Sequence, residues 1–184
     1  MPSHEITVAS RRRKTETLQK LYPGAVLLDV TSRGEEPWVR FSPFYPHGGI
    51  PVPNSPNVVS QSVEGLWQGL KVFEKEGVDS AKFSITTMKS IKRSMRSRGE
   101  VLGHRFGVDS EELLDYQTAR LKIYLPAYRF VLEHRLTAEI RQLREMAEKQ
   151  PLVLLDYETN VDVRDLSKPL SHAGLVAEYL REQG

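Results

Sequence analysis

The sequence predicts an α+β fold, built as a single compact and mostly helical domain with a few short strands. Its length of 184 residues suits one domain of ordinary size. Strand-like and helix-like segments follow one another without the regular alternation of βαβ units. No internal repeat, low-complexity segment or long Gly/Ser linker interrupts the chain. We therefore expect one domain over residues 1–184, in which residues 1–20 form a basic N-terminal segment.

The first half of the chain predicts two strands followed by an irregular segment. Gly24–Ser32 and Pro37–Ser42 are short runs with β-branched residues between turn residues, so we expect strands that could pair as a hairpin. Residues 43–56 contain five prolines, each of which removes a backbone donor and restricts the residue before it. This segment is therefore expected to be irregular.

Helical periodicity predicts most of the remaining elements. A helix should cover residues 62–76, because apolar residues recur there with a 3.6-residue period and Ser60 or Ser62 can cap it. The later elements are expected to be a strand over 83–88, a basic amphipathic helix over 88–99, a helix that starts with a capping box at Asp109–Glu112, a long helix over 126–150 with Pro126 in its first turn, a buried strand over 151–158, and a last helix over 171–183 capped by Ser171.

The composition is that of a soluble globular protein, with 39% hydrophobic and 27% charged residues. No apolar run approaches the roughly 18 residues that a membrane span needs, and the N-terminus has no apolar stretch typical of a secretory signal. The absence of cysteine excludes a disulfide framework. We therefore expect a cytoplasmic protein without a membrane partner.

Positive charge is concentrated in Arg11–Lys14 and in residues 89–98, although the formal net charge is only +2. A basic run of this kind is typical of a solvated helix face, and it also fits a surface that binds phosphate groups. Nucleic acid is therefore a candidate partner through these two segments.

One face of the predicted helix 62–76 carries candidate site residues. Glu64, Gln68 and Lys71 are spaced i, i+4 and i+7, so their side chains should lie on one side of the helix. A solvated polar stripe has the same spacing, and a carboxylate in the first turn also complements the helix dipole. The periodicity leaves both interpretations open.

A second group of candidates follows the predicted strand 151–158. Lys168, Ser171, His172 and the free N–H groups at the start of the last helix could hold a phosphate, while capping alone explains Ser171 equally well. The histidines have no metal-ligand spacing, so no metal site and no cofactor are expected. The chain contains no P-loop, G-x-G-x-x-G or G-x-S-x-G motif, which removes the usual support for a triphosphatase, a Rossmann enzyme or a hydrolase triad.

The segment "FSPFYP", followed after a proline-bearing loop by "SVEGLWQGLKVF", resembles the signature of the NADAR family of N-glycosidases, which act on riboflavin intermediates and ADP-ribose derivatives. That signature is F-S-x-F and then a helix opening S-E-x-x-x-Q-x-x-K-F, so that Glu64, Gln68 and Lys71 match its polar residues. The resemblance extends over about residues 41–181, because "HAGLVAEYLRE" is similar to the family's last helix. The chain departs from the family in its acidic loop, which has no Trp or Gly, and in Ser171, which stands where the family has asparagine.

The resemblance implies an N-glycosidase that hydrolyses the bond between a ribosyl or ADP-ribosyl group and a base, or that of a phosphorylated nucleoside, without a metal. Glu64 would stabilise the oxocarbenium-like transition state and orient the attacking water, with Asp162 as a second catalytic carboxylate. Gln68 and Lys71 would position the sugar or phosphate. The remaining candidates for substrate binding are Phe44, Tyr45 and Trp67, which could stack on a base, and His47, beside Gly48–Gly49, on a loop that could lie on a phosphate.

Two other classes of function remain open at this stage. Trp67 could belong to the core, and the altered acidic loop fits a non-catalytic module that binds ADP-ribose or a nucleotide. The basic segments alone fit a nucleic-acid-binding protein, whose binding would weaken steeply with salt.

Overall fold

The structure, a computed structural model, describes residues 5–182 and has the α+β fold that the sequence predicts. Its internal contacts divide the chain into two compact units. The terminal unit comprises Met1–Ser42 and Leu136–Gly184, and the central unit comprises Pro43–Arg135. Residues 1–4 of the predicted basic segment and residue 183 of the predicted last helix lie outside the described residues.

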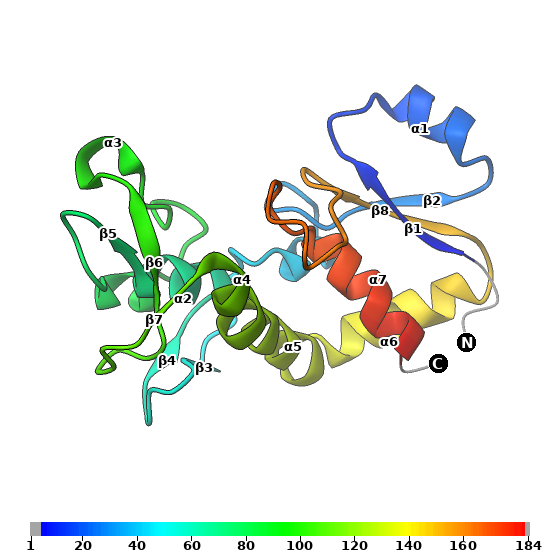
Figure 1. The fold of residues 1–184 in the computed structure, drawn as a ribbon. Coiled ribbons are helices and arrows are strands. Elements are labelled where there is room, and N and C mark those ends of the chain that lie inside the picture. Colours follow the sequence, from blue (N-terminus) through cyan, green and yellow to red (C-terminus); the bar gives the residue numbers. More distant parts are fainter. Residues whose placement is uncertain (1–4, 183–184) are drawn as a thin grey trace. The chain divides into compact units, whose positions relative to one another are not determined.

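A parallel three-stranded sheet forms the core of the terminal unit (Figure 1). Its order is β1 (Ile6–Ser10), β8 (Leu152–Asp156) and β2 (Val26–Asp29), with Val8 and Leu28 both paired to Leu154 of the central strand. The apolar run of β8 is buried on both faces, as expected for the middle strand of a parallel sheet. The predicted strands at 24–32 and 151–158 are thereby confirmed, with shorter bounds.

Helices cover both faces of this sheet (Figure 1). Leu18 of α1 (Thr15–Leu21) packs on Ala9 and Val153 on one face. The helix α7 (His172–Glu182) contacts β1 and β8 on the other face. Because side chains alternate along a strand, Leu152 and Leu154 lie on this face and Val153 lies on the face of α1. The unit also contains α6 (Thr137–Ala147), which buries Ile140, Leu143 and Ala147 along one stripe.

The predicted strand over 37–42 is wrong, and so is the hairpin with residues 24–32. Residues Trp38–Phe41 form a 3-10 turn, η1, which buries Val39 and Phe41 on one side. The segment has only one β-branched residue, and β2 instead pairs with β8, whose longer apolar run offers more buried area.

The central unit contains an antiparallel sheet and a short hairpin. The sheet has the order β5 (Lys71–Phe73), β6 (Val101–Arg105) and β7 (Leu113–Leu114). The hairpin joins β3 (Ile50–Pro51) to β4 (Val59–Ser60) inside the proline-rich region. Apart from the two residues of β3, residues 43–56 are irregular, as predicted.

The helix predicted over 62–76 is shorter than expected. It is α2 (Val63–Leu70), and the chain continues directly into β5, because residues from Lys71 on pair with β6. Gly65 and Gly69 on α2 leave room for the 3-10 turn η2 (Ser80–Ser84) to pack against it. The strand predicted over 83–88 is wrong, because residues 83 and 84 belong to this turn and residues 85–88 are irregular.

The basic helix predicted over 88–99 is reduced to one turn, α3 (Met95–Arg98). Ser90 has a positive φ of 60°, which breaks a helix at that point. The predicted end at Gly99 is confirmed, and its φ of 80° suits glycine.

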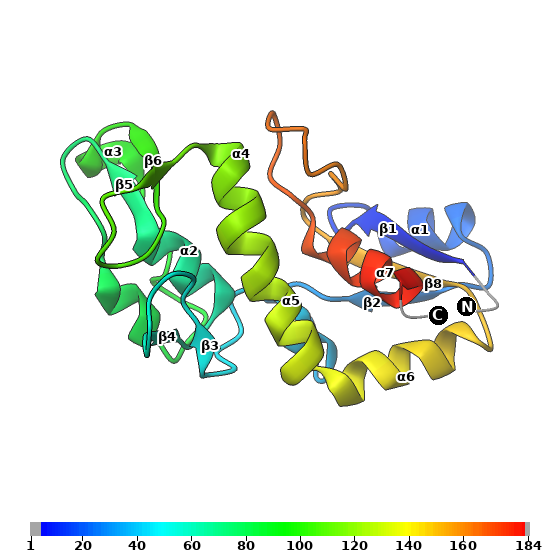
Figure 2. The ribbon, with the colours of Figure 1, turned by 60° about the horizontal axis from the view of Figure 1, so that its bottom comes forward.

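One continuous helical rod follows the sheet (Figure 2). It consists of α4 (Tyr116–Ala119), a π-helical segment η3 (Arg120–Tyr124) and α5 (Leu125–His134). Asp115 caps it through the Thr118 N–H at 2.8 Å, so the capping box predicted at Asp109–Glu112 is wrong. The region just before the cap is occupied by β7.

The long helix predicted over 126–150 is also wrong in its bounds. Pro126 lies inside the rod, where the preceding π segment accommodates the missing proline N–H. The chain then leaves helical geometry at Arg135 and Leu136, whose φ values are −121° and −118°, and α6 begins at Thr137.

Candidate active site around Glu64

The first turn of α2 fixes Glu64 in the central unit. Ser62 caps the helix, accepting a hydrogen bond from the Gly65 N–H at 2.9 Å, which decides between the two predicted caps. The Glu64 N–H donates to the Pro43 carbonyl at 2.9 Å, so the "FSPF" segment is tied to the helix start. Glu64 is half-buried, so part of it can still meet solvent or a ligand.

Gln68 lies one turn further on, and its amide contacts Glu64. Gln68 Nε2 donates to Glu64 Oε1 at 2.8 Å, while Gln68 Oε1 accepts the Arg93 backbone N–H at 3.0 Å. Only 5% of Gln68 is exposed. The structure thus brings Glu64 and Gln68 together, as the helical spacing predicts, but both ends of the Gln68 amide have protein partners.

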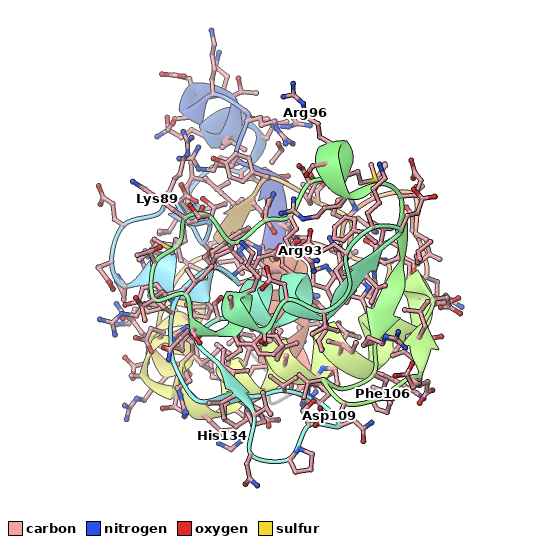
Figure 3. All side chains as sticks on the ribbon, turned by 90° about the vertical axis from the view of Figure 1, so that its left-hand side faces the viewer. Lys89, Arg93, Arg96, Phe106, Asp109 and His134 are labelled. Atoms are coloured by element: carbon pink, nitrogen blue, oxygen red, sulfur yellow. The ribbon has the colours of Figure 1, made fainter. Side chains whose placement is uncertain are left out.

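Arg93 is the buried cation that closes the end of α2. Its guanidinium donates to the carbonyls of Gln68 at 2.9 Å, Lys71 at 2.7 Å and Gly77 at 2.7 Å, and its side chain is fully buried. It also lies over the Phe73 ring. In Figure 3, Arg93 lies against α2, whereas Arg96 points outward from α3. Arg93 therefore supplies the donors that the last carbonyls of a helix lack.

Lys71 is the residue that links α2 to β5. It does not extend the helix, so the predicted single helical face of Glu64, Gln68 and Lys71 is wrong in geometry. Lys71 nevertheless lies close enough to Glu64 for their charges to interact. Burial lowers the pKa of the Lys71 ammonium, the cations Lys92 and Arg93 lower it further, and the Glu64 carboxylate opposes them.

An aromatic cluster surrounds Trp67, which is half-buried on α2. The His104 ring stacks on Trp67 with ring centres 3.7 Å apart, and Tyr124 meets Trp67 edge-on at 5.6 Å. On the π segment, Arg120 donates to the Tyr116 hydroxyl at 2.9 Å. Trp67 therefore has at least one ring face covered by protein. Its predicted stacking on a base would have to use another part of the ring.

His104 is neutral in this cluster. Burial, with the nearby cations Lys71 and Arg93, lowers its pKa to about 3. Neither ring nitrogen has a hydrogen-bond partner among the described residues, and only 2% of the residue is exposed. A charged imidazole would be unstable there.

The loop with the other predicted binding residues is attached to the start of α2. The Gly48 N–H donates to the Gln61 carbonyl at 2.9 Å. Lys92 Nζ lies 5.5 Å from the centre of the Phe44 ring, and the rings of Tyr45 and His47 are 4.7 Å apart. The structure thus brings Phe44 near the cations that surround Lys71. The binding roles of Phe44, Tyr45 and His47 stay predictions.

In the terminal unit, Asp156, Ser171 and His172 form a buried cluster at the C-terminal end of β8. Asp156 Oδ2 accepts from Ser171 Oγ at 2.8 Å and lies 3.0 Å from His172 Nδ1, while His172 Nε2 lies 2.7 Å from the Val30 carbonyl. Ser171 also caps α7 through the Gly174 N–H at 3.2 Å, which confirms the predicted cap. In this arrangement Ser171 and His172 hold the fold together, and their predicted contact with a phosphate stays a prediction.

The acidic loop before α7 is exposed and stabilised by its own turns. Asp162 Oδ1 accepts from the Arg164 N–H at 2.9 Å, and Asn160 Nδ2 donates to the Lys168 carbonyl at 3.3 Å. The structure thus places the predicted residues Asp162 and Lys168 in the terminal unit and Glu64 in the central unit. The catalytic role of Asp162 and the binding role of Lys168 stay predictions.

The two basic segments are partly used within the fold. Arg11 donates to Asp29 at 2.6 Å, and Arg12 donates to the Tyr157 carbonyl at 2.7 Å. In the second segment, Arg93 is buried and Arg98 pairs with Glu76. Fewer cations therefore face solvent than the sequence suggests, and nucleic-acid binding stays a prediction.

Within residues 5–182, no three His, Asp or Glu side chains lie together in a cluster that could hold a metal ion. No helix in this part of the chain is long and apolar enough to cross a membrane.

These features define an α+β protein in which a helix start presents a half-buried carboxylate, hydrogen-bonded to a buried amide and close to a half-buried lysine. The chain belongs to a family of unknown function, DUF6939, whose family model matches residues 10–176. Searches of curated proteins and of solved structures found no match to the chain.

Arg93 and His104 belong to this site, although the sequence did not indicate them. Arg93 lies in a run of cations, in which nothing distinguishes a buried arginine from its exposed neighbours. His104 lies two residues after an exposed apolar pair, Val101–Leu102, on a strand that was not predicted. The sequence offers no signal for its burial, because residues 101–105 do not alternate: Val101 and Leu102 are both exposed, and Gly103 and His104 are both buried.

Proposed function

We propose that the protein is an N-glycosidase that hydrolyses the N-glycosidic bond of an ADP-ribosylated or ribosylated base, or of a phosphorylated nucleoside. The observation that supports this most is the state of Glu64. It is half-buried at a helix start, and Gln68 Nε2 donates to one of its carboxylate oxygens at 2.8 Å. A carboxylate held in this way meets the main requirement of the reaction.

The chemistry assigns Glu64 two tasks. As the bond between C1 of the sugar and the base nitrogen lengthens, positive charge develops on C1 and the ring oxygen, and a fixed carboxylate stabilises it. The same carboxylate accepts a hydrogen bond from the attacking water and orients it toward C1. The water oxygen forms the new bond to C1 as the bond from C1 to the base nitrogen breaks. The water loses one proton and the departing base takes up one proton, so the reaction balances.

Lys71 and the resemblance to the NADAR signature add support. Lys71 carries a donor next to Glu64 in a half-buried position, where it suits a sugar hydroxyl or a phosphate. Glu64, Gln68 and Lys71 are also the residues that match the polar positions of that signature. The DUF6939 family match assigns no activity, so the proposal rests on these residues.

The test is release of a free base from a panel of ADP-ribosylated bases and ribosylated bases with and without phosphate, followed by chromatography. We expect the wild type to release base from at least one substrate and Glu64→Gln to reduce the rate by roughly a hundredfold or more. The matched control is Glu16→Gln, because Glu16 is also a carboxylate in the first turn of a helix, α1. It should release base at the wild-type rate.

Two outcomes would overturn the proposal. Full activity of Glu64→Gln would show that this carboxylate does not carry the reaction. Calorimetric binding of ADP-ribose without release of base from any member of the panel would favour a non-catalytic binding module.

A further inference from the structure

The Gln68 side chain is the most constrained polar group near Glu64, and its contacts indicate a role that differs from substrate binding. We propose that Gln68 and Arg93 form a positioning relay that orients the Glu64 carboxylate. The inference rests on the proposed function in one respect, namely that Glu64 is the group that acts on the substrate.

The orientation of the Gln68 amide follows from hydrogen-bond chemistry. A backbone N–H can only donate, so the atom that lies 3.0 Å from the Arg93 nitrogen must be the Gln68 carbonyl oxygen. The amide NH₂ group therefore faces Glu64, and it can only donate to the carboxylate, at 2.8 Å. A flipped amide would place two donors against each other and an oxygen against a carboxylate.

Arg93 in turn cannot shift easily. Its guanidinium is bound to three backbone carbonyls, two of which belong to Gln68 and to Lys71. Arg93 thus contacts Gln68 twice. Its backbone N–H donates to the Gln68 side chain, and its guanidinium donates to the Gln68 backbone carbonyl. Since Gln68 and Arg93 are both at most 5% exposed, water does not compete for these bonds.

The relay has a consequence for which oxygen of Glu64 reacts. Oε1 accepts the Gln68 N–H, which restricts the rotation of the carboxylate and leaves Oε2 for the water or the developing positive charge. Glu64 is only half-buried, so without the donor it would sample several rotamers. A single misoriented reacting group is enough to cost a large part of the rate.

The first experiment needs no substrate. In ¹H–¹⁵N spectra, the side-chain NH₂ signals of Gln68 are assigned by their loss in Gln68→Met. We expect Glu64→Ala to shift one of these protons upfield by removing its acceptor, and Gln68→Met to shift the Arg93 backbone N–H. The control Glu16→Ala should leave both signals in place.

The second experiment measures kinetics on a substrate found with the panel. Gln68→Met, which lacks the donor, should lower kcat roughly tenfold to a hundredfold and change KM less than twofold. A residue that binds substrate would instead raise KM.

Gln68→Glu provides a pH signature, measured as activity per folded molecule because the stability of this variant also rises as the pH falls. Two carboxylates then face each other, with Lys71, Lys92 and Arg93 as the surrounding cations and Glu76 paired with Arg93 at 3.4 Å. Only a shared proton lets Glu at position 68 donate to Glu64, so the activity of this variant should rise as the pH falls, while wild-type activity should not.

The outcomes separate the relay from the proposed function. If the Gln68 NH₂ signals do not respond to Glu64→Ala, the relay is overturned, whatever the enzyme does. If they respond and Gln68→Met has a raised KM with unchanged kcat, Gln68 binds substrate and the relay is also overturned. If Glu64→Gln retains full activity, the proposed function fails, whereas the relay still predicts the spectral shifts.

Discussion

His104 and His172 are both buried, yet their surroundings favour opposite charge states. The ring nitrogens of His172 face a carboxylate of Asp156 and the carbonyl of Val30, which can only accept. Both nitrogens must therefore carry a proton, and the imidazole is a cation. Burial alone lowers the pKa of His172, but the Asp156 charge and these hydrogen bonds raise it above the ordinary value.

His104 has no such partners. Its nitrogens face neither a carboxylate nor a carbonyl among the described residues, and the nearest charges are the cations Lys71 and Arg93. The stack on Trp67 holds a neutral ring. The pKa of His104 thus falls to about 3. The chain therefore contains one buried histidine that is neutral, His104, and one that is charged, His172.

Gly69 is a residue at which two effects of opposite sign can be compared. Alanine in a helix interior is favoured over glycine by about 1 kcal/mol. A Cβ at Gly69, however, would overlap the buried ring of Phe83 and lie 3.0 Å from the Asp79 carbonyl oxygen. Overpacking of this kind costs about 1–3 kcal/mol, so the steric effect should win.

We therefore predict that Gly69→Ala lowers the free energy of unfolding by up to about 2 kcal/mol, measured by urea denaturation. The control is Gly77→Ala, because a Cβ there meets no atom within 4 Å. This variant should be neutral or slightly more stable. A stabilised Gly69→Ala would show that helix propensity outweighs the contact between α2 and η2.

At the scale of elements, α2 depends on its N-terminal cap. Ser62 is buried, and its hydroxyl accepts the Gly65 N–H at 2.9 Å. Ser62→Ala should lower the free energy of unfolding by about 1 kcal/mol, because the donor is left unpaired. Ser94 occupies the same position before α3 without a side-chain cap bond, so Ser94→Ala should have little effect. Thermal unfolding of both variants measures the difference, and equal shifts would contradict it.

The start of α2 was predictable from sequence because a serine cap and an apolar period act locally. Its end was not, since the residues after Leu70 keep the helical pattern but pair with β6, which lies thirty positions further along the chain. The gain in sheet pairing overrides helix propensity there. The predicted strand 37–42 failed for a different reason, since one edge of β2 is open for pairing: the segment has a single β-branched residue and forms the 3-10 turn η1.

The residues of the candidate site also differ in whether local sequence predicts their contacts. Glu64 and Gln68 were predictable as neighbours because four residues of helix connect them. Arg93 was not, because its contacts to Gln68, Lys71 and Gly77 depend on an irregular segment that no periodicity describes. His104 reaches Trp67 through a strand pairing, which a single sequence does not specify.

At the scale of the whole molecule, the two units carry buried groups with opposite responses to pH. In the terminal unit, burial alone raises the pKa of Asp156, but the His172 charge and hydrogen bonds lower it below its usual range. The raised pKa of His172 stabilises the fold at pH below about 6.5, and this contribution is lost as the pH rises through the folded value. The Asp156 contribution is present above about 3.8 and is lost as the pH falls below that.

In the central unit the sign is reversed. The pKa of His104 falls from 6.5 in the unfolded chain to about 3 in the fold, so its contribution is present above pH 6.5 and is lost as the pH falls. At pH 5, about 1.5 units below the unfolded value, the loss amounts to about 2 kcal/mol. Between pH 5 and 6.5 the Asp156–His172 pair keeps its full effect.

We therefore predict that lowering the pH from 7.5 to 5 weakens the central unit selectively. Hydrogen exchange, corrected for the intrinsic pH dependence, should show protection in β5 and β6 falling by roughly thirtyfold, while protection in β1 and β8 is kept or increased. His104→Leu removes the titrating group, so this variant should lose the pH dependence in β5 and β6 even if its stability changes at every pH. An equal loss of protection in both sheets would mean that the units open together, and a loss that persists in His104→Leu would assign it to another group.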